Sequence, residues 1–363
     1  MTDKDREQTA DEKYMRRCIE LALCAEGQTS PNPMVGAVIV CDGRIIGEGW
    51  HHRAGEPHAE VNAVRSVSNT DVELLRHSTI YVSLEPCAHY GRTPPCAELI
   101  VRTGFKRVVV GCKDTFSKVS GRGIDIIRKA GIEVTVGILE NECRQLNRRF
   151  FCYNELRRPY VTLKWAQSAD GYIGLRNTAG QPMPTEISDI ECRRLSHRLR
   201  ATNDAILVGA TTVAVDNPSL TTRLWTGKDP IRLVIDPNNR IPSDSKLLTD
   251  GGKTIVFGKL NSCEVDNVRY VQLTSCTDMR KTVINVLKTS AETGIQSVVI
   301  EGGKTTLQSF IDSNVWDEAY VFCADKLLFD GVVAPKITTR GLKYDTQRVG
   351  NCALIHIENS RRE

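Results

Sequence analysis

Short apolar runs with the length of a β-strand alternate along the whole chain with longer stretches whose apolar residues recur at helical spacing. Near the N-terminus, residues 35–40 and 44–49 flank an Asp42-Gly43 pair, which is typical of a hairpin turn. Further strands are predicted over residues 79–84, 107–110 and 134–138, and helices over residues 13–26, 58–67, 96–102, 124–130 and 141–158. Strands that alternate with helices indicate an α/β layered fold.

The same alternation resumes after Arg158-Pro159, where the proline disfavours a helical conformation for the residue before it. Strands are predicted there over residues 161–166, 204–209, 231–236, 254–258, 297–303 and 318–324, and helices over residues 186–200, 278–289 and 304–313. A length of 363 residues suits two domains. We therefore expect one α/β domain at residues 1–150 and a second at residues 151–363.

The composition does not indicate a nucleic-acid or membrane partner. The formal net charge is +4 and aromatic residues make up 6% of the chain, and no run approaches the roughly 18 apolar residues of a membrane span. The 13 cysteines are odd in number, and the first residues are charged and polar, unlike a secretory signal. These features predict a reducing, cytoplasmic location in which most cysteines are small buried residues.

The strongest functional signal is His58-Ala59-Glu60, followed by Pro86-Cys87 and by Cys96. One imidazole and two thiolates form a suitable three-ligand set for catalytic Zn²⁺, which leaves the fourth position for water. Glu60 then remains free to act as general acid and base, as in the zinc deaminases. The pattern predicts a hydrolytic deaminase in which zinc generates the attacking hydroxide.

Helix geometry decides how His58 and Glu60 can share a site. Residues two apart on a helix point about 200° apart, so the pair cannot meet on a helix flank. They can meet at a helix N-terminus, and Pro57 before His58 favours a helix start at that position. Cys96 follows a proline pair and also opens a helix, where the dipole favours a thiolate.

A structural zinc site is the main alternative to a catalytic one. Such a site takes four protein ligands, and His89, between the two cysteines, is the candidate for the fourth. The cysteines are separated by eight residues, whereas the common deaminase signature has two. We expect this longer loop to fold out and back and to contribute to substrate binding.

These residues closely resemble the deaminase half of the bifunctional riboflavin-biosynthesis deaminase–reductases. The matching stretches are SPNPMVGAVIV (30–40), GEPHAEVNA (55–63), SLEPCAHYGRTPPCAELI (83–100) and SGRGIDIIRKAGIEV (120–134). Beyond the junction, the stretches that resemble the reductase half are LKWAQSADGYI (163–173), DAILVGATTVAVDNPSLTTR (204–223) and VVIEGGKTT (298–306). The resemblance implies a cytidine-deaminase-like α/β/α domain followed by a dihydrofolate-reductase-like α/β domain.

The resemblance implies two reactions and two cofactors, Zn²⁺ and NADPH. The first reaction deaminates 2,5-diamino-6-(5-phosphoribosylamino)pyrimidin-4-one, and the second reduces the ribosyl group of 5-amino-6-(5-phosphoribosylamino)uracil to ribityl. The implied partner is therefore a small phosphorylated pyrimidine, and the oligomeric state is left open, a homo-oligomer included. Asn32, His51, His89 and Arg92 are the implied contacts of the deaminase substrate. Asn32 suits a ring edge and Arg92 a phosphate.

In the second domain, Glu301-Gly302-Gly303 lies between a predicted strand and a predicted helix, whose N-terminus offers N–H groups to a phosphate. The resemblance assigns NADPH binding to Ala166, Thr212 and Asp216 and to the turn that starts at Gly303, with Lys304, Thr305 and Thr306. It assigns the phosphorylated substrate to Lys164, Arg200, Leu220, Arg223 and Glu301. A guanidinium group suits a phosphate because its donors form a planar fork.

The chain departs from the family before the helix predicted at 186–200. Where the family often has Ser-x-Trp-Ile-Thr, this chain has Pro184-Thr185-Glu186-Ile187-Ser188, which keeps a hydroxyl but lacks the aromatic residue. Two alternatives to the bifunctional enzyme remain open. One is a zinc deaminase with a non-catalytic second domain, and the other is a deaminase of tRNA or single-stranded nucleic acid.

Overall fold

The computed structural model describes residues 3–90, 94–115, 121–273, 278–338 and 340–360. Contacts divide the chain into two compact units, Met1–Arg157 and Arg158–Glu363. Helix α6 (Arg148–Leu156) spans the predicted boundary at residue 150 and belongs to the first unit. In the described part of the chain, no helix combines the length and the apolar character that crossing a membrane requires.

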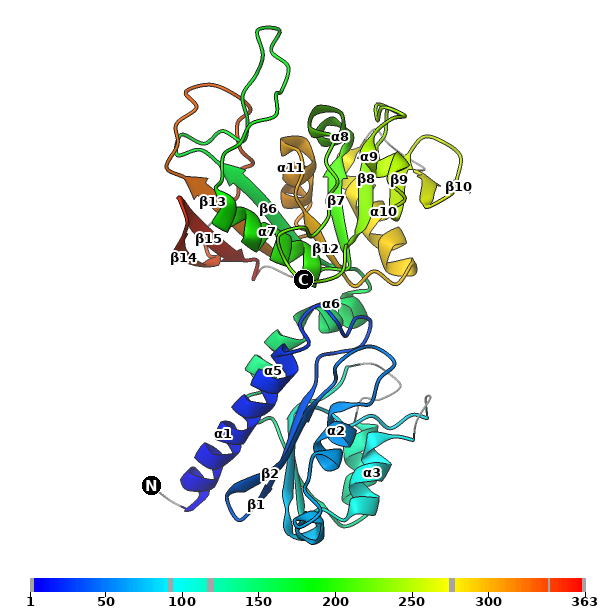
Figure 1. Ribbon diagram of the computed structural model, residues 1–363, viewed down its shortest axis with the longest axis vertical. Coiled ribbons are helices and arrows are strands. Elements are labelled where there is room, and N and C mark those ends of the chain that lie inside the picture. Colours follow the sequence, from blue (N-terminus) through cyan, green and yellow to red (C-terminus); the bar gives the residue numbers. More distant parts are fainter. Residues whose placement is uncertain (1–2, 91–93, 116–120, 274–277, 339, 361–363) are drawn as a thin grey trace. The chain divides into compact units, whose positions relative to one another are not determined.

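The first unit is a sheet with helices on both faces (Figure 1). Within its described residues the sheet has the strand order β2-β1-β3-β4-β5, in which β2, β1 and β3 are antiparallel and β3, β4 and β5 are parallel. The strands are β1 (Gly36–Cys41), β2 (Arg44–Trp50), β3 (Thr79–Leu84), β4 (Arg107–Cys112) and β5 (Glu133–Val136). The helices are α1 (Asp3–Leu23), α2 (Ala59–Arg65), η1 (Val72–His77), α3 (Cys96–Thr103), α4 (Arg122–Lys129), α5 (Glu140–Leu146) and α6.

Alternating side chains of β1 divide the core of this unit into two layers. Ala37 and Ile39 pack with α2, α3 and α4, whereas Val38 and Val40 pack with α1 and α5. Helix α2 lies close against β2 because β2 carries glycine there: a Cβ on Gly49 would overlap the backbone of the helix. This close packing fixes the start of α2, where His58 and Glu60 lie.

The second unit is also a layered α/β structure, confirming the predicted fold class for this half. Within its described residues the sheet has the order β10-β11-β9-β8-β7-β12-β6-β13-β15-β14. The strands are β6 (Tyr160–Gln167), β7 (Ala205–Gly209), β8 (Ile231–Asp236), β9 (Thr254–Gly258), β10 (Cys263–Val265), β11 (Val268–Gln272), β12 (Ser297–Ile300), β13 (Glu318–Ala324), β14 (Lys343–Val349) and β15 (Cys352–Glu358). The helices are α7 (Ile190–Thr202), α8 (Ala210–Asp216), α9 (Lys246–Thr249), α10 (Met279–Glu292) and α11 (Lys304–Asp312).

Helices α10 and α11 cover one face of this sheet, and α7, α8 and α9 cover the other. Strands β7, β12 and β6 are adjacent and parallel, so their carboxyl ends reach the same edge. Glu301 directly follows β12 and Gly209 ends β7 at this edge. Ligands in open α/β sheets bind at such edges.

Several elements differ from the sequence prediction. The helix predicted over 141–158 is interrupted at Asn147 and forms α5 and α6, and the helix predicted from 186 begins at Ile190 after the Asp189 cap. The helices η1, α8 and α9, the strands β10 and β11 and the hairpin β14–β15 were not predicted. The strand β14 is exposed at nearly every residue and therefore has no apolar alternation to identify it.

Candidate active sites

Three side chains of the first unit converge on one point. His58 Nδ1 lies 3.4 Å from Cys96 Sγ and 3.6 Å from Cys87 Sγ, and the candidate ligand atoms of all three residues lie within 4.8 Å of one another. Each residue comes from the end of a different element, because His58 caps α2, Cys96 opens α3 and Cys87 follows β3. This is the convergence of two helix starts and one strand end that the sequence predicts.

The backbone holds the two cysteines together. The Cys96 N–H donates to Cys87 Sγ at 3.3 Å, and the Ala97 N–H donates to the Cys87 carbonyl at 3.2 Å. The hydrogen bond from the Cys96 thiol, with a further contribution from His58, lowers the pKa of Cys87. The same hydrogen bond favours the protonated form of Cys96 and therefore raises the pKa of Cys96. A sulfur that is easily deprotonated suits a metal ligand.

The donor set fits Zn²⁺ in type and in spacing. Tetrahedral zinc with Zn–S of about 2.3 Å and Zn–N of about 2.0–2.1 Å separates nitrogen and sulfur ligands by about 3.6 Å. The two nitrogen–sulfur distances, 3.4 and 3.6 Å, agree with this spacing. Among the described residues no fourth protein ligand joins the group, and His89 is exposed. Three ligands are typical of a catalytic zinc.

Glu60 lies beside this cluster on the first turn of α2 and is only 3% exposed. Burial raises the pKa of its carboxyl, and its side chain contacts the Cys96 thiol. A carboxyl with a raised pKa can both take and return a proton near neutral pH. The arrangement therefore provides a proton carrier next to a candidate metal centre.

Asn32 and His51, two of the predicted substrate contacts, are hydrogen-bonded to each other. Asn32 Nδ2 and His51 Nε2 are 3.0 Å apart, and His51 Nδ1 lies 3.1 Å from the Pro57 carbonyl. Because a carbonyl only accepts, Nδ1 carries the proton and Nε2 accepts from Asn32. Burial lowers the pKa of His51, in keeping with this neutral form. The His51 ring packs edge-on against His58, with centroids 5.4 Å apart.

The other two predicted contacts belong to the loop between the cysteines. His89 is exposed on that loop, and Arg92 lies outside the described residues. Tyr90 donates from its hydroxyl to Glu98 on α3 at 2.7 Å. This hydrogen bond attaches the described part of the loop to the helix that Cys96 opens.

Two buried residues that sequence reasoning missed support the site. Asn147 accepts from the Met34 N–H and donates to the Met34 carbonyl, both at 2.8 Å, and so holds the segment that carries Asn32. Glu85, next to Pro86-Cys87, accepts four backbone N–H groups, those of Asp114, Gly121, Gly123 and Ile124. The only sequence signal for Glu85 was its place in the Glu-Pro-Cys run.

In the second unit, three predicted substrate residues form one charged cluster at the carboxyl edge of the sheet. Arg200 on α7 donates to both Glu301 oxygens, at 2.7 and 2.8 Å, and Lys164 Nζ lies 3.8 Å from Glu301 Oε2. The Glu301 side chain is 9% exposed. Burial would raise the pKa of Glu301, but Arg200 and Lys164 together lower it to about 2. Burial lowers the pKa of Lys164, and Glu301 opposes that shift.

The remaining predicted substrate residues, Leu220 and Arg223, lie on the loop after α8. Leu220 is buried with φ of +56°, and Arg223 is exposed and donates to Thr221 Oγ1 at 2.9 Å. Arg200 also donates to the Thr221 carbonyl at 3.0 Å. The charged cluster therefore contacts the loop that carries Arg223.

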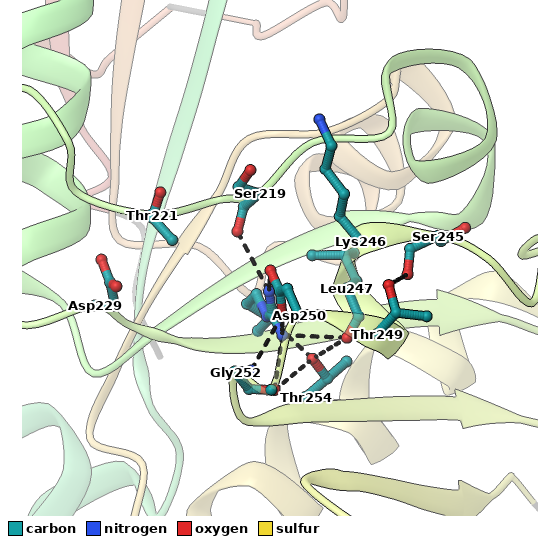
Figure 2. Close-up of polar contacts among 12 residues, drawn as sticks. Ser219, Thr221, Asp229, Ser245, Lys246, Leu247, Thr249, Asp250, Gly252 and Thr254 are labelled. Atoms are coloured by element: carbon teal, nitrogen blue, oxygen red, sulfur yellow. Dashed lines mark hydrogen bonds and ion pairs between the residues drawn. The ribbon is translucent and has the colours of Figure 1, made fainter.

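Arg232 on β8 anchors the start of this loop, since it donates to the Ser219 carbonyl at 3.5 Å. Figure 2 shows Ser219 together with Asp250, Gly252 and Thr254 of the same network. The Arg232 side chain is 4% exposed and pairs with both Asp250 oxygens at 2.7 Å. It also donates to the carbonyls of Leu247 and Gly252 and to the hydroxyl of Thr254.

Asp229 adds a second anchor to the loop, because it accepts from the N–H and the hydroxyl of Thr222. Sequence reasoning did not identify Arg232 or Asp229.

The predicted NADPH residues border the glycine turn between β12 and α11. A Cβ on Gly302 would lie 2.9 Å from Thr212 Oγ1, and Gly303 has φ of +60°, which favours glycine. The N-terminus of α11 begins directly after this turn and suits a cofactor phosphate. Of the other predicted residues, Lys304, Thr305 and Asp216 are exposed, Thr306 is buried, and Ala166 lies half-buried on β6.

The stretch that departs from the family lies before α7. Ile187 is buried in a cluster with Cys192 and Phe322, whereas Glu186 is exposed and pairs with Arg193 at 2.8 Å. Ser188 is half-buried. Glu186, at the position of the family's tryptophan, therefore faces solvent, whereas Ile187, which matches the family's isoleucine, packs this stretch onto the core.

Comparison with known proteins identifies both halves. Residues 8–112 match the family described as the cytidine and deoxycytidylate deaminase zinc-binding region, and residues 159–347 match the RibD C-terminal domain. The riboflavin biosynthesis protein RibD of Aquifex aeolicus is 39% identical over 335 residues, 92% of each chain. The RibD protein of Escherichia coli is 36% identical over 334 residues, 88% of each chain.

Solved structures with both halves are also similar. The diaminohydroxyphosphoribosylaminopyrimidine deaminase/5-amino-6-(5-phosphoribosylamino)uracil reductase of Thermotoga maritima superimposes with a TM-score of 0.85 and 35% identity, covering 97% of this chain and 99% of that one. One crystal form of RibD from Acinetobacter baumannii gives a TM-score of 0.84 and 32% identity, covering 98% of this chain and 100% of that one.

Proposed function

This chain belongs to the RibD family of riboflavin-biosynthesis enzymes, and on that premise we propose which of its residues carry each of two reactions. It is a bifunctional enzyme, a hydrolase and an oxidoreductase, with Zn²⁺ and NADPH as cofactors. It deaminates 2,5-diamino-6-(5-phosphoribosylamino)pyrimidin-4-one and then reduces the ribosyl group of 5-amino-6-(5-phosphoribosylamino)uracil to ribityl. The observation that carries the site assignment is the convergence of His58, Cys87 and Cys96 beside buried Glu60.

We assign deamination to the first unit, where His58, Cys87 and Cys96 hold the zinc. Zinc supplies Lewis acidity that lowers the pKa of a water molecule. Glu60 takes one proton from that water and delivers it to the ring nitrogen, and then takes the remaining hydroxyl proton and delivers it to the departing amino group. A carbon–oxygen bond forms at the ring, the carbon–amino bond breaks, and ammonia leaves. The burial that raises the pKa of Glu60 suits this two-way transfer.

Asn32 and His51 orient the pyrimidine in this proposal. His51 Nε2 accepts one amide N–H of Asn32, which fixes the amide and leaves its oxygen to accept from the ring substituents. His89 and Arg92, on the loop between the cysteines, contact the phosphoribosyl end. This assignment rests on the family resemblance and on the charge of Arg92.

We assign reduction to the second unit. When bound at the glycine turn beside Thr212, NADPH supplies a hydride for C1 of the opened sugar. Arg200 and Arg223 bind the substrate phosphate, and Leu220 packs against the substrate between them. Lys164 Nζ, which is buried beside Glu301, provides the proton that balances the hydride, because burial makes its ammonium a better donor. Glu301 keeps both neighbouring cations in place.

The partner that these sites favour is a small phosphorylated pyrimidine and not a nucleic acid. Incubation with the diaminopyrimidinone and NADPH tests the whole proposal, since ammonia and the loss of NADPH absorbance are followed together. Ammonia without NADPH oxidation, and without NADPH binding in a fluorescence titration, would favour a non-catalytic second unit. Deamination of a free oligonucleotide at a comparable rate would contradict the assigned substrate.

The cysteine ligands also bear on the location of the enzyme. Zinc binds thiolates, so Cys87 and Cys96 function only while they are reduced. We propose the cytoplasm, where thiols are kept reduced. Fractionation that finds the active protein outside the cytoplasm would contradict this placement.

A further inference from the structure

We propose that His197 is a positioning residue of the reductase, which holds the backbone beside Arg223 so that this guanidinium meets the substrate phosphate. The proposal rests on the function assigned above to the second unit. His197 belongs to none of the substrate or cofactor residues predicted from the sequence, yet it is buried among them.

The position of His197 follows from helix geometry. It lies three residues before Arg200 on α7, so the two side chains share one face of the helix. Its Nδ1 lies 3.2 Å from the backbone nitrogen of Leu224, which directly follows Arg223. Because the backbone N–H donates, Nδ1 must be unprotonated, and the ring proton is on Nε2.

The surroundings of His197 keep the imidazole neutral. Burial and then Arg200 lower the pKa of His197 to about 4. The charged groups that act on its ring are Arg200, Glu301, Arg223 and Lys164, which are the four charged residues assigned to the reductase substrate. A neutral ring is required, since a proton on Nδ1 would displace the Leu224 N–H. The cations that bind substrate therefore preserve the hydrogen bond to the loop, and their effect outweighs the opposing effect of Glu301.

The net charge of the cluster fits the ligand that Arg223 would hold. Three cations and one carboxylate give +2 with His197 neutral, and a phosphate monoester carries about −1.5 to −2 at pH 7. A protonated His197 would add a further positive charge, so that the cluster would carry more charge than the phosphate neutralises. The ring thus fixes the loop without adding a charge to the site.

Other contacts hold neighbouring parts of the loop, and the Trp225 N–H donates to the Thr222 carbonyl at 3.0 Å, which closes a turn around Arg223 and Leu224. Asp229 accepts from Thr222, and the Arg198 guanidinium lies over the Trp225 ring at 5.8 Å from its centroid. The hydrogen bond to His197 ties this turn to α7 at Leu224, next to Arg223, which is itself exposed and attached through its side chain to Thr221. Without His197, this turn loses its hydrogen bond to α7, and the Arg223 guanidinium is held less firmly towards the charged cluster.

Three substitutions separate positioning from direct substrate contact. His197→Asn keeps an acceptor at the position of Nδ1, His197→Gln keeps a polar group at the position of Nε2, and His197→Leu removes both. The full-length, zinc-loaded protein is titrated with ribose 5-phosphate by calorimetry, and reductase kinetics are measured with the deaminated substrate. Loss of one hydrogen bond corresponds to a change of about tenfold in affinity.

We expect His197→Leu and His197→Gln to bind ribose 5-phosphate about tenfold more weakly and to raise KM by about the same factor, with kcat changed by less than about twofold. We expect His197→Asn to stay close to the unsubstituted protein. In an Arg223→Ala background, His197→Leu should weaken binding no further, because the group it positions is gone. A variant set in which His197→Gln is normal and His197→Asn is weak would overturn positioning and indicate direct contact through Nε2.

Two controls keep the outcome interpretable. Arg194→Ala removes a side chain on the same helix that pairs with Glu191 at 2.8 Å, and it should change neither binding nor KM. Ammonia release by the first unit reports whether each variant is folded and loaded with zinc. Failure of the unsubstituted protein to reduce the substrate would reject the proposed function itself, whereas equal affinity in all His197 variants would reject only the positioning role.

Discussion

Arg200 donates two hydrogen bonds to Glu301, at 2.7 and 2.8 Å, although 101 positions separate the two residues in the sequence. The pair joins helix α7 to the carboxyl end of β12 and lies almost entirely out of solvent. A bidentate guanidinium–carboxylate pair is strongly directional. It therefore fixes the two groups in the geometry that the reductase substrate meets.

Glu301→Gln should remove a pH-dependent part of the stability of the second unit. The pKa of Glu301 is lowered from 4.5 to about 2, because Arg200 and Lys164 outweigh the effect of burial. A lowered pKa stabilises the fold above the unfolded value and loses that effect as pH falls from about 4.5 towards 2. Over this range the unfolding free energy of the unsubstituted protein should fall by about 3 kcal/mol more than that of the variant.

Denaturant unfolding followed by tryptophan fluorescence measures this difference, since three of the four tryptophans, Trp165, Trp225 and Trp316, lie in the second unit. Parallel stability curves for the two proteins between these pH values would contradict the assigned pairing. The variant should also lose reductase activity at neutral pH while it still releases ammonia.

Glu60→Gln should retain zinc but lose ammonia release. The amide keeps the size of the carboxyl and leaves the three ligand residues untouched, but it cannot accept the proton from water. General acid–base groups contribute about 10²–10⁴-fold to rate, and a loss of this size is expected. Metal analysis and an ammonia assay on the same sample decide the matter, and loss of zinc from the variant would contradict the assigned role.

Removal of the metal should affect only one of the two activities. A chelator that strips zinc abolishes ammonia release, since the site has lost its Lewis acid. NADPH oxidation with the deaminated substrate should continue at an unchanged rate, because the reductase residues lie in the other unit. Recovery of deamination on adding back zinc is the control, and parallel loss of both activities would contradict independent sites.

Arg223→Ala should slow NADPH consumption and leave deamination intact. Loss of a charge-assisted hydrogen bond to phosphate lowers kcat/KM by about 10–100-fold. The two activities are measured on one preparation, with ammonia for the first and NADPH absorbance for the second. Equal damage to both would show that Arg223 does not serve a separate reductase site.

Gly303→Ala should weaken NADPH binding. Its φ of +60° is unfavourable for alanine, and the new Cβ would lie 3.4 Å from Thr212 Oγ1 in the turn before α11. Gly294→Ala is the matched control, since Gly294 has φ of +85° with nothing near its Cβ. Both variants should lose about 1–3 kcal/mol of stability, because a residue with a Cβ is strained at positive φ, but only Gly303→Ala should raise the Kd of NADPH in a fluorescence titration.

The sequence predicted those parts of the protein that depend on neighbouring residues. Apolar periodicity reflects the local backbone conformation, and it located most of the strands and helices of both α/β units. The runs around His58 and Cys96 predicted two helix starts at the site, because in each run proline residues directly precede the ligand and signal a helix start. The hairpin β14–β15 escaped prediction, since an exposed edge strand needs no apolar pattern.

The tertiary structure alone decided which distant residues meet. Nothing local pairs Asn32 with His51, Asn147 with Met34, or His197 with Leu224. These contacts depend on strand order and on helix placement, which bring together segments separated by 19 to 113 positions. Short-range patterns record the conformation of the backbone, whereas the neighbours of a buried polar group are fixed only when the layers pack.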